Sequence, residues 1–508
     1  MTAQPTKNSK TPSSKTDPST QTGPSNHTTL STNLDQNIAH LKTLFPIPKS
    51  FDIVTRDLYL GSTRAYWVGI NGFCRTEVLQ QIFSDLQNPL YMETPEIEEI
   101  KRYMNTRIGY AQATLVKDWD KISLNLLSGP SVLLIDGFDQ AIILDTRTYP
   151  ARSVEEPDTE RVTRGSRDGF IETLLYNTNL IRRRIRSPKL TFEILTVGSV
   201  SQTDVALAYI DGEADAQLLK QLKTALRNLK ITSLTMGAKS LEELLIPKSK
   251  WHPLPAMHLT ERPDVACSFL SEGHVAVIVD NSPTVLILPN TIFQFTQSPE
   301  DYYKSTIVGT YFRFVRFLCI PVNLLLLPVF LLITVYYPQL SAQLKLLSTQ
   351  DLPGPTIIFY VLAVELLLDL FKYSTSLSSS RFSGSLSIIG GLIIGEIAVD
   401  LNWASPEILF YASMTLLTTL ALSSIEFADG IKVYRMFLIV ATAIFGPWGF
   451  WIGCGLVVLS ILTTPTFAGR SYFWPLVPFN WKALKTLLFR YSTTRAQPSN
   501  IWEREGRH

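Results

Sequence analysis

Long apolar runs occur only in the last two-fifths of the chain, beyond about residue 310. The clearest run covers 314–337, and shorter ones cover 356–371, 383–399 and 407–423. A helix needs about 20 apolar residues to cross a bilayer, so these runs predict membrane-spanning helices. We therefore expect a transmembrane α-helical bundle over 306–465, preceded by a soluble region.

A last apolar stretch, 434–464, is long for one crossing and short for two, which need about 40 residues. The sequence Gly-Pro-Trp-Gly at 446–449 interrupts it. Basic side chains follow in the tail: Arg470, Lys482, Lys485 and Arg490. Because basic residues concentrate on the cytoplasmic side of membranes, this pattern favours a broken or re-entrant hairpin that returns the tail to the cytoplasm. Residues 466–508 are then expected to form an interfacial segment and a cytoplasmic tail.

Charged residues near the ends of the apolar stretches set the expected orientation. Arg313 and Arg316 lie at the start of the first span, which places that end in the cytoplasm. Glu365 and Asp369 fall near the cytoplasmic end of the second span. A further set of charged residues is expected to lie in a cytoplasmic loop. These residues are Glu426, Asp429, Lys432 and Arg435.

The soluble region repeats one alternating pattern. Residues 51–86 read as strand, turn, strand and amphipathic helix, and 192–230 read in the same order. A hairpin of buried strands follows in each copy. The offset is about 140 residues in both comparisons, which predicts a tandem duplication. The expected fold of this region is α+β, with two tandem related subdomains at 33–160 and 191–305.

Residues 1–32 are rich in Ser, Thr, Pro, Asn, Gln and Lys, and they contain no apolar core. This composition is typical of a disordered tail and not of a secretory signal peptide. The soluble region is therefore expected to stay in the cytoplasm. The four cysteines are scattered without metal-ligand spacing, which fits a reducing compartment.

Between the two subdomains, 161–190 is expected to form a basic connecting helix. Ser166 or Asp168 is the expected cap, and a proline follows the end of the helix. The basic cluster at this end consists of Arg182, Arg183, Arg184 and Arg186. Cations are favourable at a helix C-terminus, so a solvated connecting helix explains the cluster. A contact between subunits is the functional alternative. Nucleic-acid binding is disfavoured because no aromatic platform accompanies the arginines.

The stretch 383–399 differs from the other spans because it is built largely from Gly, Ser and Ile. Small residues let helix backbones approach closely, so a packing helix explains this composition. The functional alternative is a helix that lines a pore, with a glutamate that favours cations. The candidate pore-lining residues are Ser387, Gly391, Ile394, Gly395 and Glu396.

Composition and motifs give no support for catalysis. The net charge is +2, so there is no global basic field for nucleic acid. The sequence has no phosphate-binding glycine loop and no arrangement of a nucleophile with a base. We therefore expect no enzyme activity, no catalytic residues, no metal site, no cofactor and no nucleic-acid partner.

Three blocks of the sequence resemble a known family. They are EEPDTERVTRGSRDGFIETLLYNTNLIRRRIRSPKL at 155–190, QFTQSPEDYYKSTIVGTYFRFVRFL at 294–318, and the glycine-rich stretch followed by Ser405-Pro406-Glu407. Over about residues 34–485 the chain resembles the A subunits of the GerA family of spore germination proteins.

The resemblance implies a multi-pass protein of the spore inner membrane. Its N-terminal region and C-terminal tail are expected to face the cytoplasm or spore core. The expected partners are further copies of the chain in a homo-oligomer, expected to be a pentamer, a B-type transporter-like membrane subunit and the lipid bilayer. The implied function is a channel subunit that releases monovalent cations during germination, and the alternative is a non-conducting scaffold or sensor. A secondary transporter is less favoured, because transporters carry inverted repeats and the repeat found here is soluble.

Overall fold

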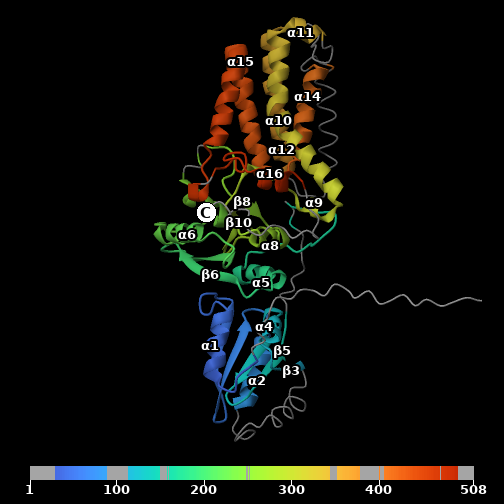
Figure 1. Cartoon of the computed structure of the whole chain (residues 1–508). Helices are drawn as coiled ribbons and strands as arrows, with labels where there is room; N and C mark the ends of the chain where they lie inside the picture. Colours follow the sequence, from blue (N-terminus) through green and yellow to red (C-terminus); the bar gives the residue numbers. More distant parts are fainter. Residues whose placement is uncertain are drawn as a thin grey trace, which may run out of the picture.

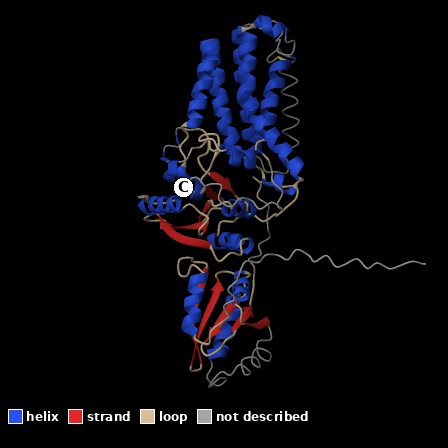
Figure 2. Ribbon diagram, viewed as in Figure 1, coloured by secondary structure: helices blue, strands red, loops and turns tan. Residues whose placement is uncertain are grey.

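The computed structural model describes residues 29–87, 112–148, 157, 160–247, 250, 252–343, 352–377, 400, 405–469 and 471–489. Figure 1 shows two units of helices and strands stacked beneath a bundle of long helices. In Figure 2 the strands of the described residues lie in the two lower units, and the bundle is helical. Most of the predicted tail, 1–28, lies outside the described residues.

The first subdomain is an antiparallel sheet with helices on both faces. Its elements are α1 (Leu34–Leu44), β1 (Ile53–Leu60), β2 (Thr63–Ile70), α2 (Thr76–Gln87), β3 (Gln112–Val116), α4 (Trp119–Leu127), β4 (Ser131–Ile135) and β5 (Ala141–Asp145). The strands pair in the order β1-β2-β4-β5-β3. Side chains of successive strand residues point to opposite faces. Thus Val68 packs with α1 and α4, whereas its neighbour Trp67 packs with α2.

The second subdomain repeats this arrangement. Its elements are α5 (Leu174–Arg184), β6 (Leu190–Val197), β7 (Thr203–Ile210), α6 (Ala216–Asn228), α7 (Gly237–Leu245), β8 (His258–Thr260), α8 (Pro263–Ser271), β9 (Val275–Val279) and β10 (Val285–Leu288). The sheet order is β6-β7-β9-β10-β8. Helices α5 and α8 cover one face, and α6 and α7 cover the other.

The two subdomains share details as well as strand order. The backbone N–H of Leu34, the first residue of α1, donates to Asp136 Oδ1 at 3.0 Å. The N–H of Leu174, the first residue of α5, donates to Asp280 Oδ1 at 3.1 Å. In both cases the acid directly follows an inner strand, β4 or β9. Its side chain caps the first helix of its own subdomain. The predicted α+β fold of two tandem related subdomains is confirmed.

Helix α5 is the counterpart of α1 and packs within the second subdomain. It occupies only the middle of the expected helical segment 161–190. The expected caps, Ser166 and Asp168, lie in the preceding loop, where both bind Arg184. The cap prediction was wrong because the acceptor comes from a distant hairpin, which local sequence does not indicate.

The bundle contains α10 (Thr306–Tyr336), α11 (Pro338–Gln343), α12 (Gly354–Leu377), α14 (Pro406–Leu420) and α15 (Ile425–Leu462). By length and composition, α10, α15 and the segment Gly354–Tyr373 of α12 are each able to cross a membrane. Helix α10 packs against both α14 and α15 and forms the centre of the bundle. The predicted α-helical transmembrane bundle is therefore confirmed.

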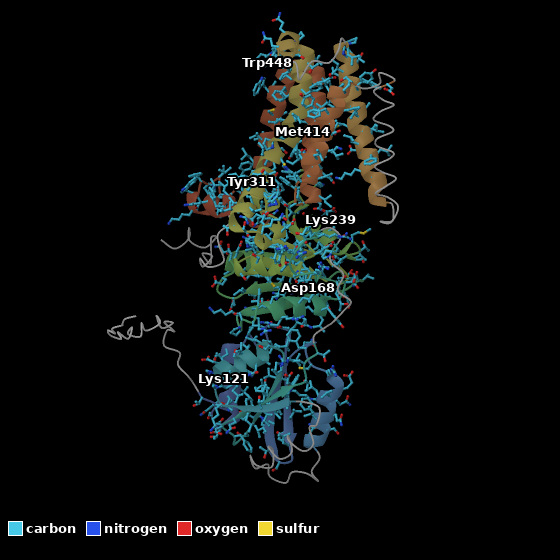
Figure 3. The ribbon with its side chains drawn as sticks, turned by 90° about the vertical axis from the view of Figure 1, so that its right-hand side faces the viewer. Lys121, Asp168, Lys239, Tyr311, Met414 and Trp448 are labelled. Carbon is cyan, nitrogen blue, oxygen red and sulfur yellow. The ribbon has the colours of Figure 1, made fainter. Side chains whose placement is uncertain are left out.

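Helix α15 is a hairpin of two arms, 425–445 and 447–462. Gly446 separates them with φ 61° and ψ −142°, a backbone conformation that glycine adopts readily. The arms run side by side, because Tyr434 Oη and Ser460 Oγ are 2.7 Å apart. Figure 3 places Trp448, just after the break, at the end of the bundle farthest from the soluble subdomains. The predicted hairpin is confirmed, and it returns the chain to the side of the soluble region.

The segment after the hairpin fastens the bundle to the second subdomain. It contains the short helices η3 (Phe467–Gly469) and α16 (Trp481–Leu488). Tyr472 is fully buried and donates from its hydroxyl to the carbonyl of Pro255 at 3.1 Å. Arg313 of α10 donates to the carbonyl of Leu487 at 3.1 Å. The C-terminal segment is thus part of the junction between the two regions.

Candidate functional site in the membrane bundle

A buried hydrogen-bond network joins α10, α12, α14 and α15. Arg435 of α15 is 2% exposed, and its Nη2 donates to Glu365 Oε2 of α12 at 2.9 Å. Its Nη1 donates to Asn323 Oδ1 of α10 at 2.6 Å. Asn323 Nδ2 in turn donates to Thr419 Oγ1 of α14 at 2.6 Å. The network is therefore continuous from one side of the bundle to the other.

A second basic residue of α15 extends the network. Lys432 Nζ lies 3.6 Å from Glu365 Oε2 and also pairs with Asp369. Lys432 and Arg435 are three residues apart, and Glu365 and Asp369 are four apart, so each pair lies on one helical face. Opposite charges therefore face each other between α12 and α15.

The network lies deep in the bundle. At 1.5 Å per residue, the first arm of α15 is about 30 Å long, close to the thickness of a bilayer core. By the same rise, Arg435 lies about 15 Å from the start of that arm, beyond the first turns, which contact the second subdomain through Phe427 and Gly430. Ionisable groups buried inside a membrane bundle are costly unless paired, and they usually mark a functional position.

Two buried atoms of the network have no hydrogen-bond partner among the described residues. They are Glu365 Oε1 and Arg435 Nε. Leaving a buried polar atom unpaired costs about 1–3 kcal/mol. Apolar side chains could hold the helices together without this loss of stability. Each of these atoms therefore has capacity for a further hydrogen bond.

These charges were misplaced by the sequence interpretation. Glu426, Asp429, Lys432 and Arg435 were expected in a cytoplasmic loop, but all four lie in the first arm of α15. The apolar residues between these charges could have indicated that the helix begins earlier. The apolar stretch was expected to begin at Tyr434, but the helix begins at Ile425. Arg435 therefore lies within the helix and faces the acids of α12.

A second buried charge cluster lies where the soluble region meets the bundle. Asp301 belongs to α9 (Pro299–Tyr303) and is 2% exposed. It pairs with Arg316 of α10 and lies 3.5 Å from Arg313 Nε. Arg316 Nε also donates to the carbonyl of Thr296, in η2 (Ile292–Thr296), at 2.9 Å. Helix α10 cannot shift relative to the second subdomain without breaking these contacts.

An aromatic column crosses the same junction. The ring centroids of Phe269 and His258 are 5.1 Å apart, and those of His258 and Phe295 are 5.7 Å apart. Phe295 stacks on Phe427 of α15, with the centroids 5.1 Å apart. The column connects the second sheet to the first arm of the hairpin through packed side chains.

The predicted subunit-contact arginines have different environments. Arg182 is fully buried and pairs with Asp52 of the first subdomain, with Nε and Oδ2 2.8 Å apart. Arg184 is half-buried and binds Asp168. Arg183 and Arg186 are exposed, and Arg186 also donates to Ser128 at 3.3 Å. Arg182, Arg184 and Arg186 thus all bind groups of the same chain, and the subunit contact stays a prediction.

The predicted pore residues cannot be placed. Ser387, Gly391, Ile394, Gly395 and Glu396 lie outside the described residues. The pore assignment therefore stays a prediction. For the residues that are described, no group of three or more His, Cys, Asp or Glu side chains is arranged to hold a metal ion.

Comparison with known proteins places most of the chain in one group. The family model described as Bacillus/Clostridium GerA spore germination protein matches residues 39–500. Stage V sporulation protein AF of Bacillus subtilis (strain 168) is 32% identical over 458 residues, covering 90% of this chain and 92% of the relative. Spore germination protein KA of the same organism is 30% identical over 470 residues, covering 91% of this chain and 85% of the relative.

A solved structure is also similar in sequence. It is the crystal structure of the N-terminal domain of the A subunit of the Bacillus megaterium spore germinant receptor GerK3. The identity is 27% and the TM-score is 0.41, covering 52% of this chain and 97% of that one.

Proposed function

This chain belongs to the GerA family of spore germination proteins and is a germination-related membrane subunit, and on that premise we propose that it is a subunit of an oligomeric ion channel. The channel releases monovalent cations across the spore inner membrane during germination. It amplifies the response that nutrient receptors begin. In this proposal the chain has no catalytic role and needs no cofactor.

The observation that best supports an active membrane domain is the network of Arg435, Glu365 and Asn323. A bundle that served only as an anchor would have no reason to bury charges among its helices. The unpaired atoms Glu365 Oε1 and Arg435 Nε leave the network able to exchange partners when the helices move. We propose that this network sets the position of the helices around the conducting path.

The proposed assembly is a homo-oligomer, a pentamer, that works with a B-type transporter-like membrane subunit in the lipid bilayer. The N-terminal region and the C-terminal segment face the cytoplasm or spore core. Their common side is supported by the hydrogen bond from Tyr472 to Pro255. The exposed pair Arg183 and Arg186 remains the proposed contact between neighbouring subunits, and 383–399 remains the proposed pore helix.

Substitution of the proposed pore helix tests the channel directly. We expect Gly391→Leu and Ile393→Ala to change potassium efflux from germinating spores, because they change the width of a closely packed path. Gly455→Ala is the matched control, because a Cβ at Gly455 meets nothing within 4 Å. Unchanged efflux across a scan of all residues from 383 to 399 would refute the pore assignment.

The second candidate is a non-conducting scaffold or sensor subunit. The cluster of Asp301, Arg313 and Arg316 favours it, because it attaches a large soluble region rigidly to α10. Purified full-length chain in potassium-loaded liposomes separates the two functions. Conductance from this chain alone removes the scaffold, whereas flux carried by the partner subunit in liposomes that lack this chain removes the channel.

A further inference from the structure

A cavity of about 880 Å³ lies at the junction between the second subdomain and the bundle. Its walls come from β8, α8, η2, α9, the start of α10 and the loop between α14 and α15. Small-molecule sites commonly have volumes of about 300–1,000 Å³ and often form between domains. We call this space the junction cavity.

The lining of the junction cavity contains more acidic than basic side chains. Seven Asp or Glu side chains line it, against three Lys or Arg side chains. Several of the acids are paired, such as Asp301 with Arg316 and Glu300 with Lys304. Glu272, at the end of α8, has no ion pair within 4 Å among the described residues. Burial raises the pKa of Glu272 to about 7, and the charge of Arg313 only partly opposes this rise.

Two buried polar atoms on opposite walls also lack partners among the described residues. His258 is 9% exposed and lines the cavity from β8, and its Nδ1 makes no hydrogen bond. Ser423 lines it from the loop before α15, and its Oγ makes none. Burial lowers the pKa of His258 to about 4, so its imidazole is neutral near pH 7. A neutral imidazole and a hydroxyl can both accept hydrogen bonds.

We propose that the junction cavity binds a small organic ammonium ion. Its N–H groups would donate to the carboxylate of Glu272 and to the neighbouring acceptors, and its positive charge would pair with that carboxylate. The aromatic rings of Phe269 and Phe295 line the same space and suit the carbon atoms and positive charge of an organic cation. A metal ion is less suitable, because the described residues include no cluster of metal-ligand side chains.

The position of the junction cavity gives the proposed ligand a physical effect. One wall belongs to the soluble region and the opposite wall to the membrane bundle, so the ligand contacts both. Binding would therefore stabilise the junction in its present arrangement. This inference goes beyond ion conduction, and it can be correct or wrong independently of the proposed channel.

Ligand binding can be measured on the full-length chain in detergent micelles or nanodiscs at pH 7.5. The probe is butylammonium chloride, titrated while thermal unfolding is followed by tryptophan fluorescence and binding is followed by calorimetry. We expect saturable binding and a higher melting temperature. Potassium chloride at the same ionic strength should not produce this shift. An equal shift with potassium would overturn the assignment of an organic cation.

Two variants and one control locate the site. Glu272→Gln should weaken butylammonium binding at least ten-fold, because it removes the carboxylate. Ser268→Phe should block binding by filling the cavity, and it keeps the proposal testable if the first variant folds poorly. Glu243→Gln, on the exposed face of α7, should leave the affinity within two-fold. Equal binding by the unsubstituted chain and by folded Ser268→Phe would place the ligand elsewhere and overturn the proposal.

Discussion

Arg182 in the soluble region and Arg435 in the membrane bundle are both buried, but their partners differ. Each guanidinium nitrogen of Arg182 donates a hydrogen bond, to Asp52 and to the carbonyls of Ser187 and Leu190. The Nε of Arg435 has no partner among the described residues. A fully paired arginine fixes one geometry, whereas a partly paired one leaves another arrangement accessible.

The difference suggests separate roles for the two regions. Arg182 lies in the second subdomain and Asp52 in the first, so their ion pair holds the duplicated units in one orientation. Lys49, which contacts Glu193 at 3.7 Å, supports the same interface at its exposed edge. Arg435 instead connects several helices whose relative positions determine any path through the bundle. We interpret the soluble pair as a fixed joint and the membrane network as the adjustable part.

Breaking the membrane network should have the largest effect. Arg435→Met leaves Glu365 buried without its strongest partner, so we expect the full-length chain to lose about 3–5 kcal/mol of stability. Denaturant unfolding in detergent measures this loss. The double variant Arg435→Met with Glu365→Leu removes both charges and should recover most of the stability.

The double variant separates structure from function. If the network acts on conduction, the recovered protein should still show altered cation flux in liposomes. A double variant with both normal stability and normal flux would leave the network with a packing role only, and the contrast with Arg182 would disappear.

Breaking the soluble pair should have a smaller effect. Asp52→Asn removes the negative charge but leaves Arg182 its two carbonyl acceptors, so we expect a loss of about 2 kcal/mol. Hydrogen exchange should rise at the interface between the two subdomains. Asp57→Asn is the matched control, because this exposed acid on β1 makes only a surface pair with Arg64. Equal effects of the two substitutions would contradict the role of a fixed joint.

The junction between the two regions can be tested with a pair of glycines in α15. A Cβ at Gly430 would lie 2.5 Å from the carbonyl oxygen of Pro253, whereas one at Gly455 meets nothing within 4 Å. Gly430→Ala should therefore force the hairpin away from the soluble region and cost about 1–2 kcal/mol. Gly455→Ala should change stability little. Thermal unfolding of the two variants gives the comparison, and similar melting temperatures would show that the close approach is unimportant.

The last test is a dependence of stability on pH at the same junction. Burial raises the pKa of Glu272 to about 7, above its ordinary value of 4.5. The native protein therefore keeps this proton when the unfolded chain has lost it, so stability falls as pH rises from about 4.5 to 7. Arg313 of α10 and Tyr302 of α9 are the charged and titratable groups that act on Glu272 from the elements packed against it.

Glu272→Gln removes this titration. Relative to the unsubstituted chain, the variant should gain about 2–3 kcal/mol of stability between pH 5 and pH 8, when no ammonium ligand is present. Melting temperatures at the two pH values measure the gain. If the melting temperatures of the two proteins differed by the same amount at pH 5 and at pH 8, Glu272 would have an ordinary pKa.

The sequence by itself determined the order of elements, the duplication and the hairpin break. These features are local or periodic. Consecutive apolar residues specify strands buried on both faces, as Trp67 and Val68 illustrate, and a repeated pattern yields a repeated sheet order. The break at Gly446 was found because glycine and proline in succession both disfavour a continuous helix.

Only the tertiary structure decided which charges meet. In the sequence, Arg182 belongs to a basic cluster that predicts a solvated helix end. The fold instead places Asp52, 130 residues earlier, against its guanidinium. Arg435 reads as part of a loop, yet Glu365 and Asn323 come from other helices and make its burial possible. The physical reason is that the cost of burying a charge depends on its partners in space, and sequence patterns report only neighbours along the chain.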